Sequence, residues 1–121
     1  MHSFSARLVV LAVAIASLVL VAALMGIVPR PYVVTAIDYH FHDAHPTLPL
    51  LPGQDLVVTN QGRNLHNVSI PALGFSQDIR VGGRVTIEDI ADRLAPGRYQ
   101  MFCRIHLKAF GMKGVIIVAS E

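Results

Sequence analysis

The sequence contains a single cysteine, no tryptophan, and few charged residues among its 121 positions. A lone cysteine, Cys103, excludes an internal disulfide, and it also excludes any metal centre that needs two cysteines in one loop, such as a dinuclear copper site. Without a disulfide framework, cysteine usage does not indicate a redox compartment. The compartment therefore has to be inferred from the N-terminal segment.

Charge is equally sparse. Charged residues make up 15% of the chain and the formal net charge is +2. Two of the positive charges, Arg7 and Arg30, flank an apolar run, and without them the chain is about neutral (+2 − 2 = 0). A nucleic-acid-binding domain typically carries a clustered basic face, which is lacking here. We expect no nucleic-acid partner.

The apolar residues are concentrated near the N-terminus. From Leu8 to Val28, about 21 residues, there is no charged side chain. As a helix this run would rise roughly 32 Å, and the hydrocarbon core of a bilayer is about 30 Å thick. The pattern predicts a transmembrane anchor within residues 1–30, followed by one domain at 31–121.

A cleaved signal peptide is the alternative interpretation, although Ala22 to Gly26 make only a poor cleavage site. No cysteine follows the apolar run, which excludes a lipoprotein anchor. Arg7 and the free amino terminus favour a cytoplasmic N-terminus. We therefore expect a single-pass protein of the cell membrane, with its C-terminal domain on the exoplasmic (periplasmic or extracellular) side.

After residue 31 the chain consists of short apolar, β-branched segments separated by Gly, Pro and Asn turns, with no long helix. This pattern predicts an all-β, antiparallel β-sandwich. Residues 71–77 are predicted to be a loop, and 88–94 one helical turn or an irregular loop. The predicted strands cover residues 32–37, 54–60, 65–70, two pieces of 78–87 broken at Gly82-Gly83, 98–103 and 114–119.

The stretch from Pro96 to Gly114 carries the chemistry. It holds Cys103, then His106 three residues later, then Met112 six residues beyond that. A thiolate, an imidazole and a thioether suit copper, which proteins hold in a His2Cys site with a weak axial methionine. With all four positions filled by protein, no position remains for a substrate, so we do not expect an enzyme. The second histidine must come from elsewhere.

Strand alternation selects a candidate. Within residues 65–70, His66 shares a face with the core residues Val68 and Ile70. Within 98–103, Cys103 shares a face with Met101, which we expect to lie in the core. A sandwich that buries both faces could bring His66 and Cys103 together at one end.

Three further histidines, His40, His42 and His45, could form a second metal site, since His40 and His42 would share one strand face. No soft ligand accompanies them. A solvated strand edge is the favoured interpretation, and binding of Cu(II) or Zn(II) stays open.

The order of these motifs resembles a known family. His66-Asn67-Val68 is followed by Pro-Gly-x-Tyr-x-x-x-Cys-x-x-His, ending at His106, and then by Gly-Met-x-Gly-x-x-x-Val, starting at Gly111. This sequence is similar to the cupredoxins, or blue-copper proteins, and most similar to the plastocyanin, pseudoazurin and amicyanin group. The resemblance covers most of residues 32–121.

The resemblance implies a Greek-key sandwich with one mononuclear copper ion. It implies His66, Cys103 and His106 as equatorial ligands and Met112 as the axial ligand. It also implies that Asn67 ties the two ligand loops together, its backbone N–H donating to the Cys103 sulfur.

Two positions depart from the family pattern. Five residues separate His106 from Met112, one more than in plastocyanins, which leaves the axial distance, the potential and the colour open. The tryptophan that commonly precedes the asparagine of the second strand is absent, since Thr59 precedes Asn60. That change concerns packing more than chemistry.

We expect a membrane-anchored, monomeric one-electron carrier that cycles between Cu(II) and Cu(I) and serves redox partner proteins at the membrane. Leu107 and Phe110 beside His106 form a candidate docking patch, with ordinary loop packing as the alternative. Two other functions stay open: an extracytoplasmic copper-binding or delivery protein without an electron-transfer role, and a metal-free interaction module. The basic residues that would ring the patch, or else be ordinary solvated surface, are Arg104, Lys108 and Lys113.

Overall fold

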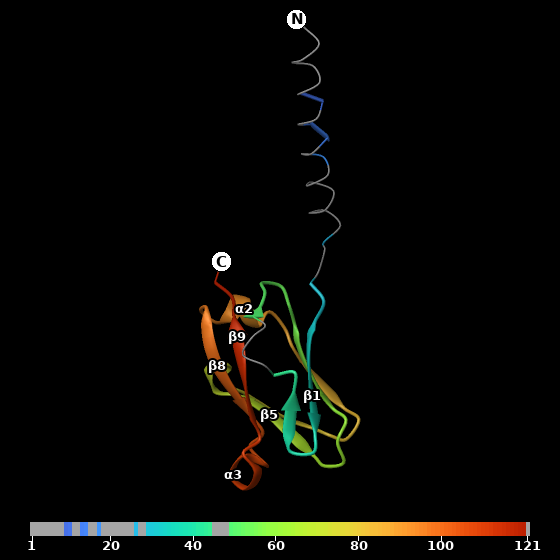
Figure 1. Ribbon diagram of the computed structural model, residues 1–121, viewed down its shortest axis with the longest axis vertical. Helices are drawn as coiled ribbons and strands as arrows, with labels where there is room; N and C mark the ends of the chain where they lie inside the picture. Colours follow the sequence, from blue (N-terminus) through green and yellow to red (C-terminus); the bar gives the residue numbers. More distant parts are fainter. Residues whose placement is uncertain are drawn as a thin grey trace, which may run out of the picture.

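The computed structural model describes residues 9–10, 13–14, 17, 26, 29–44 and 49–120. From residue 32 onward these form a sandwich of two β-sheets with very little helix (Figure 1). The strands are β1 (Tyr32–Ile37), β2 (His40–His42), β3 (Pro49–Leu50), β4 (Leu56–Asn60), β5 (His66–Ile70), β6 (Phe75–Ile79), β7 (Arg84–Ile87), β8 (Gly97–Phe102) and β9 (Lys113–Val118). The helical turns are η1 (Pro71–Leu73), α2 (Ile90–Arg93) and α3 (Leu107–Phe110).

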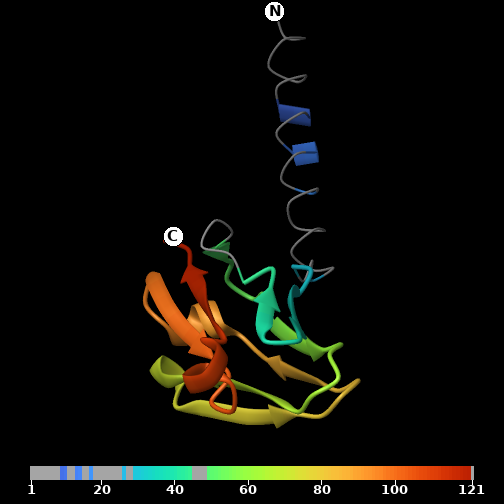
Figure 2. The ribbon, with the colours of Figure 1, turned by 60° about the horizontal axis from the view of Figure 1, so that its bottom comes forward.

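The two sheets have the strand orders β2-β1-β4-β7 and β3-β9-β8-β5-β6. Figure 2 shows the second sheet, with β5 and β6 below β8 and β9 in that view. The chain passes back and forth between the sheets, so that neighbours in space are often distant in sequence. The predicted all-β sandwich is confirmed.

The expectation of a purely antiparallel sandwich is wrong for two strand pairs. β1 pairs with β4 in parallel, from Tyr32↔Leu56 to Ala36↔Asn60, and β3 pairs with β9 in parallel. Parallel neighbours need a crossover connection rather than a tight hairpin. For β1 and β4, the segment after β2 supplies that crossover, because it visits the other sheet at β3.

The loop predicted for residues 71–77 is only partly a loop. η1 makes a tight reversal that ends at Gly74, whose φ of 60° lies in the left-handed region that glycine adopts without strain. β6 then begins at Phe75, which lies opposite Ile70 of β5. The predicted break at Gly82-Gly83 does separate β6 from β7. β2 and β3, with three and two residues, are too short for periodicity to reveal.

The core lies between the sheets and follows the strand alternation. One apolar cluster includes Val34 and Ala36 of β1 together with Val68 and Ile70 of β5, and all four side chains are fully buried. β5 is unusual because all five of its residues are buried, including the polar ones. Strand β5 is therefore covered on both faces.

Most of the predicted N-terminal anchor, Leu8 to Val28, lies outside the described residues. Positions 9, 10, 13, 14 and 17 are helical, and Val9, Val10 and Val13 are exposed. Within the described part of the chain, no helix is both long and apolar enough to span a bilayer.

Met101 provides a test of the core. Its side chain is fully buried between the sheets, so Met101→Ala should lower the free energy of unfolding by about 2–5 kcal/mol. Val81→Ala, at an exposed position, should change it by less than about 0.5 kcal/mol. Urea unfolding followed by circular dichroism measures both, and equal effects would contradict this core.

Candidate metal centre

Strand β8 delivers Cys103 to one end of the sandwich. The residue follows β8 directly and is fully buried. Its backbone N–H donates to the carbonyl of Met112 (3.0 Å), and its carbonyl accepts from the N–H groups of His106 (3.2 Å) and Leu107 (2.8 Å). These bonds turn the chain into α3 immediately after the cysteine. The cysteine backbone is thereby fixed from both sides of the loop.

The longer loop is accommodated by α3. Phe110 N–H donates to the carbonyl of His106 (3.0 Å), and Gly111, with φ of 63°, ends the turn in a left-handed conformation. The chain then returns to Met112, which is 1% exposed and hydrogen-bonded through its carbonyl to Cys103. The extra residue is thus taken up in a helical turn. Axial ligation by Met112 stays a prediction.

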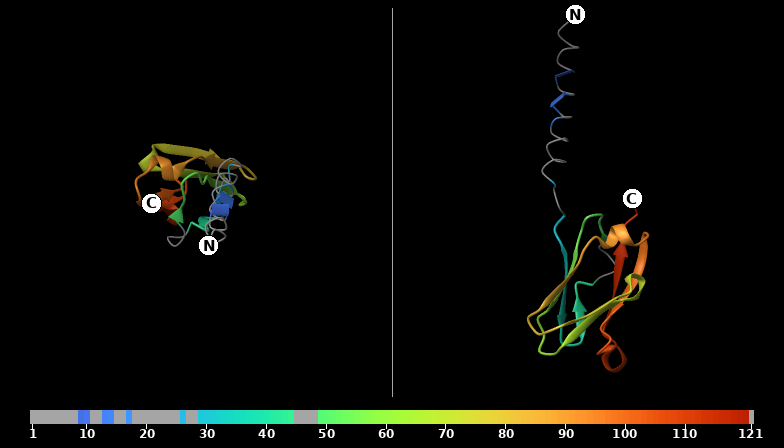
Figure 3. Two further views of the ribbon diagram at one scale, coloured as in Figure 1. Left: turned by 90° about the horizontal axis from the view of Figure 1, so that it is seen from above. Right: turned by 180° about the vertical axis from the view of Figure 1, so that it is seen from behind.

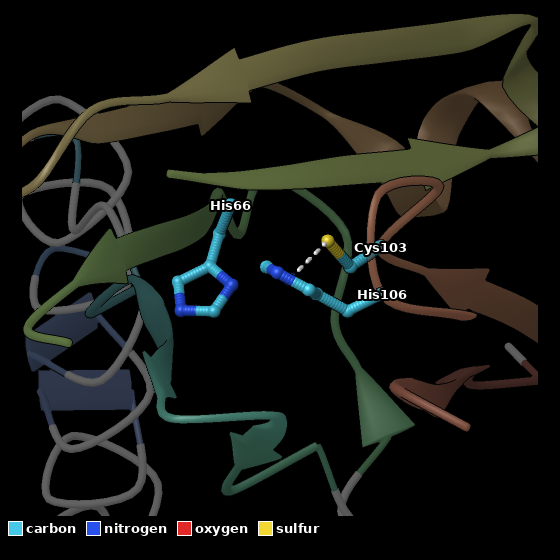
Figure 4. Close-up of side chains that lie close together, drawn as sticks. All are labelled: His66, Cys103 and His106. Carbon is cyan, nitrogen blue, oxygen red and sulfur yellow. Dashed lines mark hydrogen bonds between the residues drawn. The ribbon is translucent and has the colours of Figure 1, made fainter. Parts of the chain in front are cut away.

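His66 comes from the first residue of β5, in the same sheet as β8. Its ligating nitrogen, the Cys103 sulfur and the ligating nitrogen of His106 lie within 4.8 Å of one another. The Cys103 Sγ is 3.5 Å from His106 Nδ1. Figure 4 shows one ring nitrogen of His66 directed toward His106 and Cys103. Three residues from two separate parts of the chain therefore converge on one point.

The other ring nitrogen of His66 faces the backbone near Gly62. A Cβ atom at Gly62 would lie only 3.1 Å from His66 Nε2, so glycine leaves room for the imidazole there. Nδ1 is thereby the nitrogen left to face the cluster. Neither nitrogen has a hydrogen-bond partner among the described residues, although the side chain is fully buried. Buried polar atoms are normally paired, so an orphaned imidazole indicates a missing ligand.

Electrostatics keep His66 in the form that binds metal. Burial lowers the pKa of the His66 imidazole below its ordinary value, the charge of nearby His106 lowers it further, and Asp38 opposes both. The neutral imidazole is the form that coordinates metal ions. The site therefore favours an ion over a proton.

The donor set determines which ion fits. One thiolate and two imidazoles form the trigonal set that proteins use for copper in electron-transfer sites. The His66, Cys103 and His106 cluster fits one mononuclear copper ion. Within the described residues it is the one group of three or more metal-ligating His, Cys, Asp or Glu side chains that lie close together.

Asn67 contacts the sulfur directly. Its backbone N–H donates to Cys103 Sγ at 3.3 Å, the contact that the family resemblance implies. The Asn67 side chain is fully buried and lies on the face of β5 opposite His66. Adjacent residues of one strand thus supply a candidate ligand and a hydrogen bond to the sulfur.

Tyr39 is a contact that sequence reasoning missed. It lies between β1 and β2, and the turn that joins these strands is at the same end of the molecule as α3 (Figure 3). Its ring stacks on Phe110, with centroids 3.6 Å apart and planes 3° apart, and meets the edge of the His106 ring at 5.1 Å. A turn residue has no periodicity to reveal this role. The opposite sheet therefore supports His106 through an aromatic contact.

His40 and His42 do not join the copper site. Both are exposed on β2, an edge strand, with ring centroids 6.2 Å apart. No third ligating side chain groups with them among the described residues, and His45 lies outside those residues. The structure agrees with a solvated strand edge.

The candidate docking patch is only partly exposed. Phe110 is 51% exposed, whereas Leu107 is half-buried. Among the surrounding basic residues, Arg104 forms an ion pair with Asp78, with a nitrogen–oxygen distance of 2.8 Å. Its charge is therefore balanced within the molecule, which weakens the predicted basic ring.

Comparison with known families agrees with this geometry. The sequence model of the cupredoxin-like domain matches residues 9–118, nearly the whole chain. The chain belongs to the cupredoxin-like family. A comparison of the cupredoxin-like sequence with curated proteins finds no significant match.

Several solved structures share the fold. A proline-to-glycine mutant of amicyanin in its reduced Cu(I) form is 18% identical, with a TM-score of 0.56 over 74% of this chain and 82% of amicyanin. A mutant fern plastocyanin is 17% identical, with a TM-score of 0.58 over 72% of this chain and 99% of plastocyanin. The copper-containing nitrite reductase of Thermus scotoductus is 21% identical, with a TM-score of 0.61 over 77% of this chain but 23% of the enzyme. At these identities the likeness establishes the fold alone.

The lowered pKa of His66 predicts how the metal-free protein responds to acid. The unfolded imidazole titrates near its ordinary pKa of about 6.5, above the folded pKa, so the unfolded state binds more protons below that pH. The stabilisation should be complete above about pH 6.5 and decline as pH falls below it. Urea unfolding of the metal-free protein across this range measures the decline.

His66→Leu is the control, because it removes the titrating group from a buried site. Its stability should vary less with pH in the same range. The hydrogen bond from the Asn67 side chain lowers the pKa of Asp78 below its ordinary value of 3.8. The contribution of Asp78 to stability is therefore lost only at a lower pH than that of His66. A stability that rises on acidification through pH 6 in the unmodified protein would contradict the assigned burial of His66.

Tyr39→Ala should loosen His106, because it removes both aromatic contacts. In the metal-free protein the ring proton resonances of His106 should shift and broaden in NMR spectra. The free energy of unfolding should fall by about 0.5–1.5 kcal/mol beyond the loss of buried area. Tyr39→Phe keeps the ring and should preserve the spectrum; identical His106 resonances in all three proteins would exclude the contact.

Proposed function

We propose that this cupredoxin-like protein is a one-electron carrier with a single mononuclear copper ion. The observation that carries the proposal is the buried His66–Cys103–His106 cluster, whose ligating atoms lie within 4.8 Å and whose His66 nitrogens are otherwise unpaired. The ion would supply the chemistry by alternating between Cu(II) and Cu(I). Met112, buried and bonded to Cys103 through its carbonyl, is the proposed axial ligand.

The protein contributes rigidity. Cys103 is held by backbone bonds to the Met112 carbonyl and from the Asn67 N–H, and His106 is packed against the Tyr39 ring. His66 lies within a strand that is buried along its whole length. Ligands that do not move between oxidation states keep the reorganisation energy of electron transfer small. This arrangement supports electron transfer over catalysis.

His106 is the proposed route for the electron. It is partly exposed and is flanked by Phe110, which is half exposed, so a partner seated on this end would approach the imidazole closely. Exposed apolar residues of this kind often mark interaction sites. Phe110 and Leu107 are the proposed docking residues for a redox partner protein.

Membrane attachment is proposed on the sequence. The uncharged run from Leu8 to Val28 is long enough to span a bilayer, and residues 29–31 lead directly into β1. The start of β1 lies at the end of the sandwich that is remote from α3, and α3 follows Cys103 in the chain (Figure 1). An anchor there would leave the copper end directed away from the bilayer, on the exoplasmic side, toward membrane-associated partners.

Copper titration tests the proposed function. The protein should bind one equivalent of Cu(II) and develop an intense visible copper–thiolate absorption. The bound copper should undergo reversible one-electron reduction in voltammetry. Cys103→Ser should abolish the absorption, because oxygen replaces the thiolate donor. Leu51→Ala should leave the absorption unchanged, because Leu51 is exposed and lies beside the end of β9 that is remote from the cluster.

The delivery alternative predicts a different outcome. A copper-delivery protein would bind Cu(I) tightly, pass it rapidly to an acceptor chelator, and form no stable Cu(II) complex. That result would exclude the electron carrier, and absence of any metal uptake would exclude both functions. Visible absorption that survives in Cys103→Ser would refute the ligand assignment.

A further inference from the structure

The Asn67 side chain has every hydrogen-bonding position filled. Its Nδ2 donates to Asp78 Oδ1 (2.9 Å) and Ser76 Oγ (3.2 Å). Its Oδ1 accepts from Ser69 Oγ (2.6 Å) and from the backbone N–H of Arg104 (3.3 Å). A primary amide offers two donors and one oxygen with two lone pairs, so no capacity is left. This residue is therefore fixed in both position and orientation.

Two of these partners also hold each other. Arg104 Nη2 lies 2.8 Å from Asp78 Oδ1 and 3.1 Å from Oδ2. Asp78 belongs to β6 and lies directly opposite Asn67 of β5, whereas Arg104 follows Cys103 in the ligand loop. The ion pair closes a ring of contacts that runs from β6 through Asn67 to the ligand loop.

The ion pair between Asp78 and Arg104 contributes little to the free energy of folding. The Arg104 and Asp78 side chains are 56% and 43% exposed, and ion pairs at such positions contribute little to folding. The amide beneath them is fully buried. Asp78 accepts from the Asn67 side chain, and the backbone N–H of the same residue donates to the Cys103 sulfur, so the pair can affect the sulfur through the position of Asn67.

We propose that Asp78 and Arg104 are positioning residues of the copper site, which hold the Asn67 N–H on the Cys103 sulfur and thereby set the reduction potential. The inference rests on the proposed copper function and adds two residues to it. Among the contacts described above, neither the Asp78 nor the Arg104 side chain touches Cys103 or His66. Each acts through Asn67, whose backbone N–H donates to the sulfur at 3.3 Å. We call the contacts of Asp78 and Arg104 that hold Asn67 the clamp.

The proposal predicts an effect opposite to simple electrostatics. A hydrogen bond to the sulfur withdraws electron density from the thiolate, which favours the reduced form and raises the potential. A negative charge near the site favours the oxidised form and lowers the potential. Removing the Asp78 charge alone should raise the potential, whereas releasing Asn67 should lower it.

The experiment compares Asp78→Ala with Asp78→Asn in the copper-loaded protein. Both variants lose the same charge, but the asparagine amide oxygen can still accept from Asn67 Nδ2. Voltammetry should therefore give a lower potential for Asp78→Ala than for Asp78→Asn. Arg104→Gln removes a positive charge and should lower the potential, but by less in the Asp78→Ala background, where Asn67 is already released, than in the unmodified protein. Equal potentials for Asp78→Ala and Asp78→Asn would overturn the proposal.

A second readout uses the metal-free protein. Hydrogen exchange of the Asn67 backbone N–H should be about fivefold faster in Asp78→Ala than in Asp78→Asn, as expected for one weakened hydrogen bond. The amide of Val58, in the core of the other sheet, reports global stability and should exchange equally in both variants. Any difference in exchange at Val58 measures a difference in global stability between the two variants and is subtracted. Equal exchange at the Asn67 backbone N–H after this subtraction would also overturn the clamp.

Different results would exclude the proposed copper function and the positioning role of Asp78 and Arg104. If the unmodified protein forms no copper–thiolate absorption, the proposed function fails, whatever the variants show. If it forms that absorption and reduces reversibly, but the two Asp78 variants have one potential, only the clamp fails.

Discussion

The copper site depends on how strand β5 meets strand β8. His66 and Asn67 lie on β5, and Cys103 follows β8 some 36 positions later in the sequence. The two strands share one bridge, Ser69↔Phe102, beyond which the ladder gives way to the N–H of Asn67 and the sulfur of Cys103. A shift of this pairing by one residue would turn His66 away from the cluster. Register between these strands is therefore the constraint that assembles the ligands.

Polar residues on the second face of β5 protect that register. Asn67 and Ser69 are buried, and burying them without partners would be costly. Asn67 has hydrogen bonds to β6 and to the ligand loop, and the Ser69 hydroxyl bonds to Ser76 of β6. A slipped strand would leave these groups unpaired. The same network that we assign to tuning the potential thus also specifies the pairing on which the site is built.

Much of the site was predictable because its information is local. Cys103 and His106 lie within one turn, and period-two alternation directs His66 toward the core, which the structure confirms. Tyr39 and Asp78 were not predictable. Each acts across the fold, Tyr39 from a turn of the other sheet and Asp78 from a neighbouring strand, and neither follows a motif or a periodic pattern. The parallel pair β1–β4 was missed for the same reason, since pairing direction depends on how the chain crosses between sheets.

Copper-edge X-ray absorption spectroscopy of the loaded protein shows directly which side chains bind the ion. We expect one short copper–sulfur bond from Cys103 and two nitrogen ligands from His66 and His106, retained in the oxidised and the reduced protein. A first shell of nitrogen and oxygen alone, or the loss of a histidine on reduction, would contradict a rigid one-electron carrier built on this cluster.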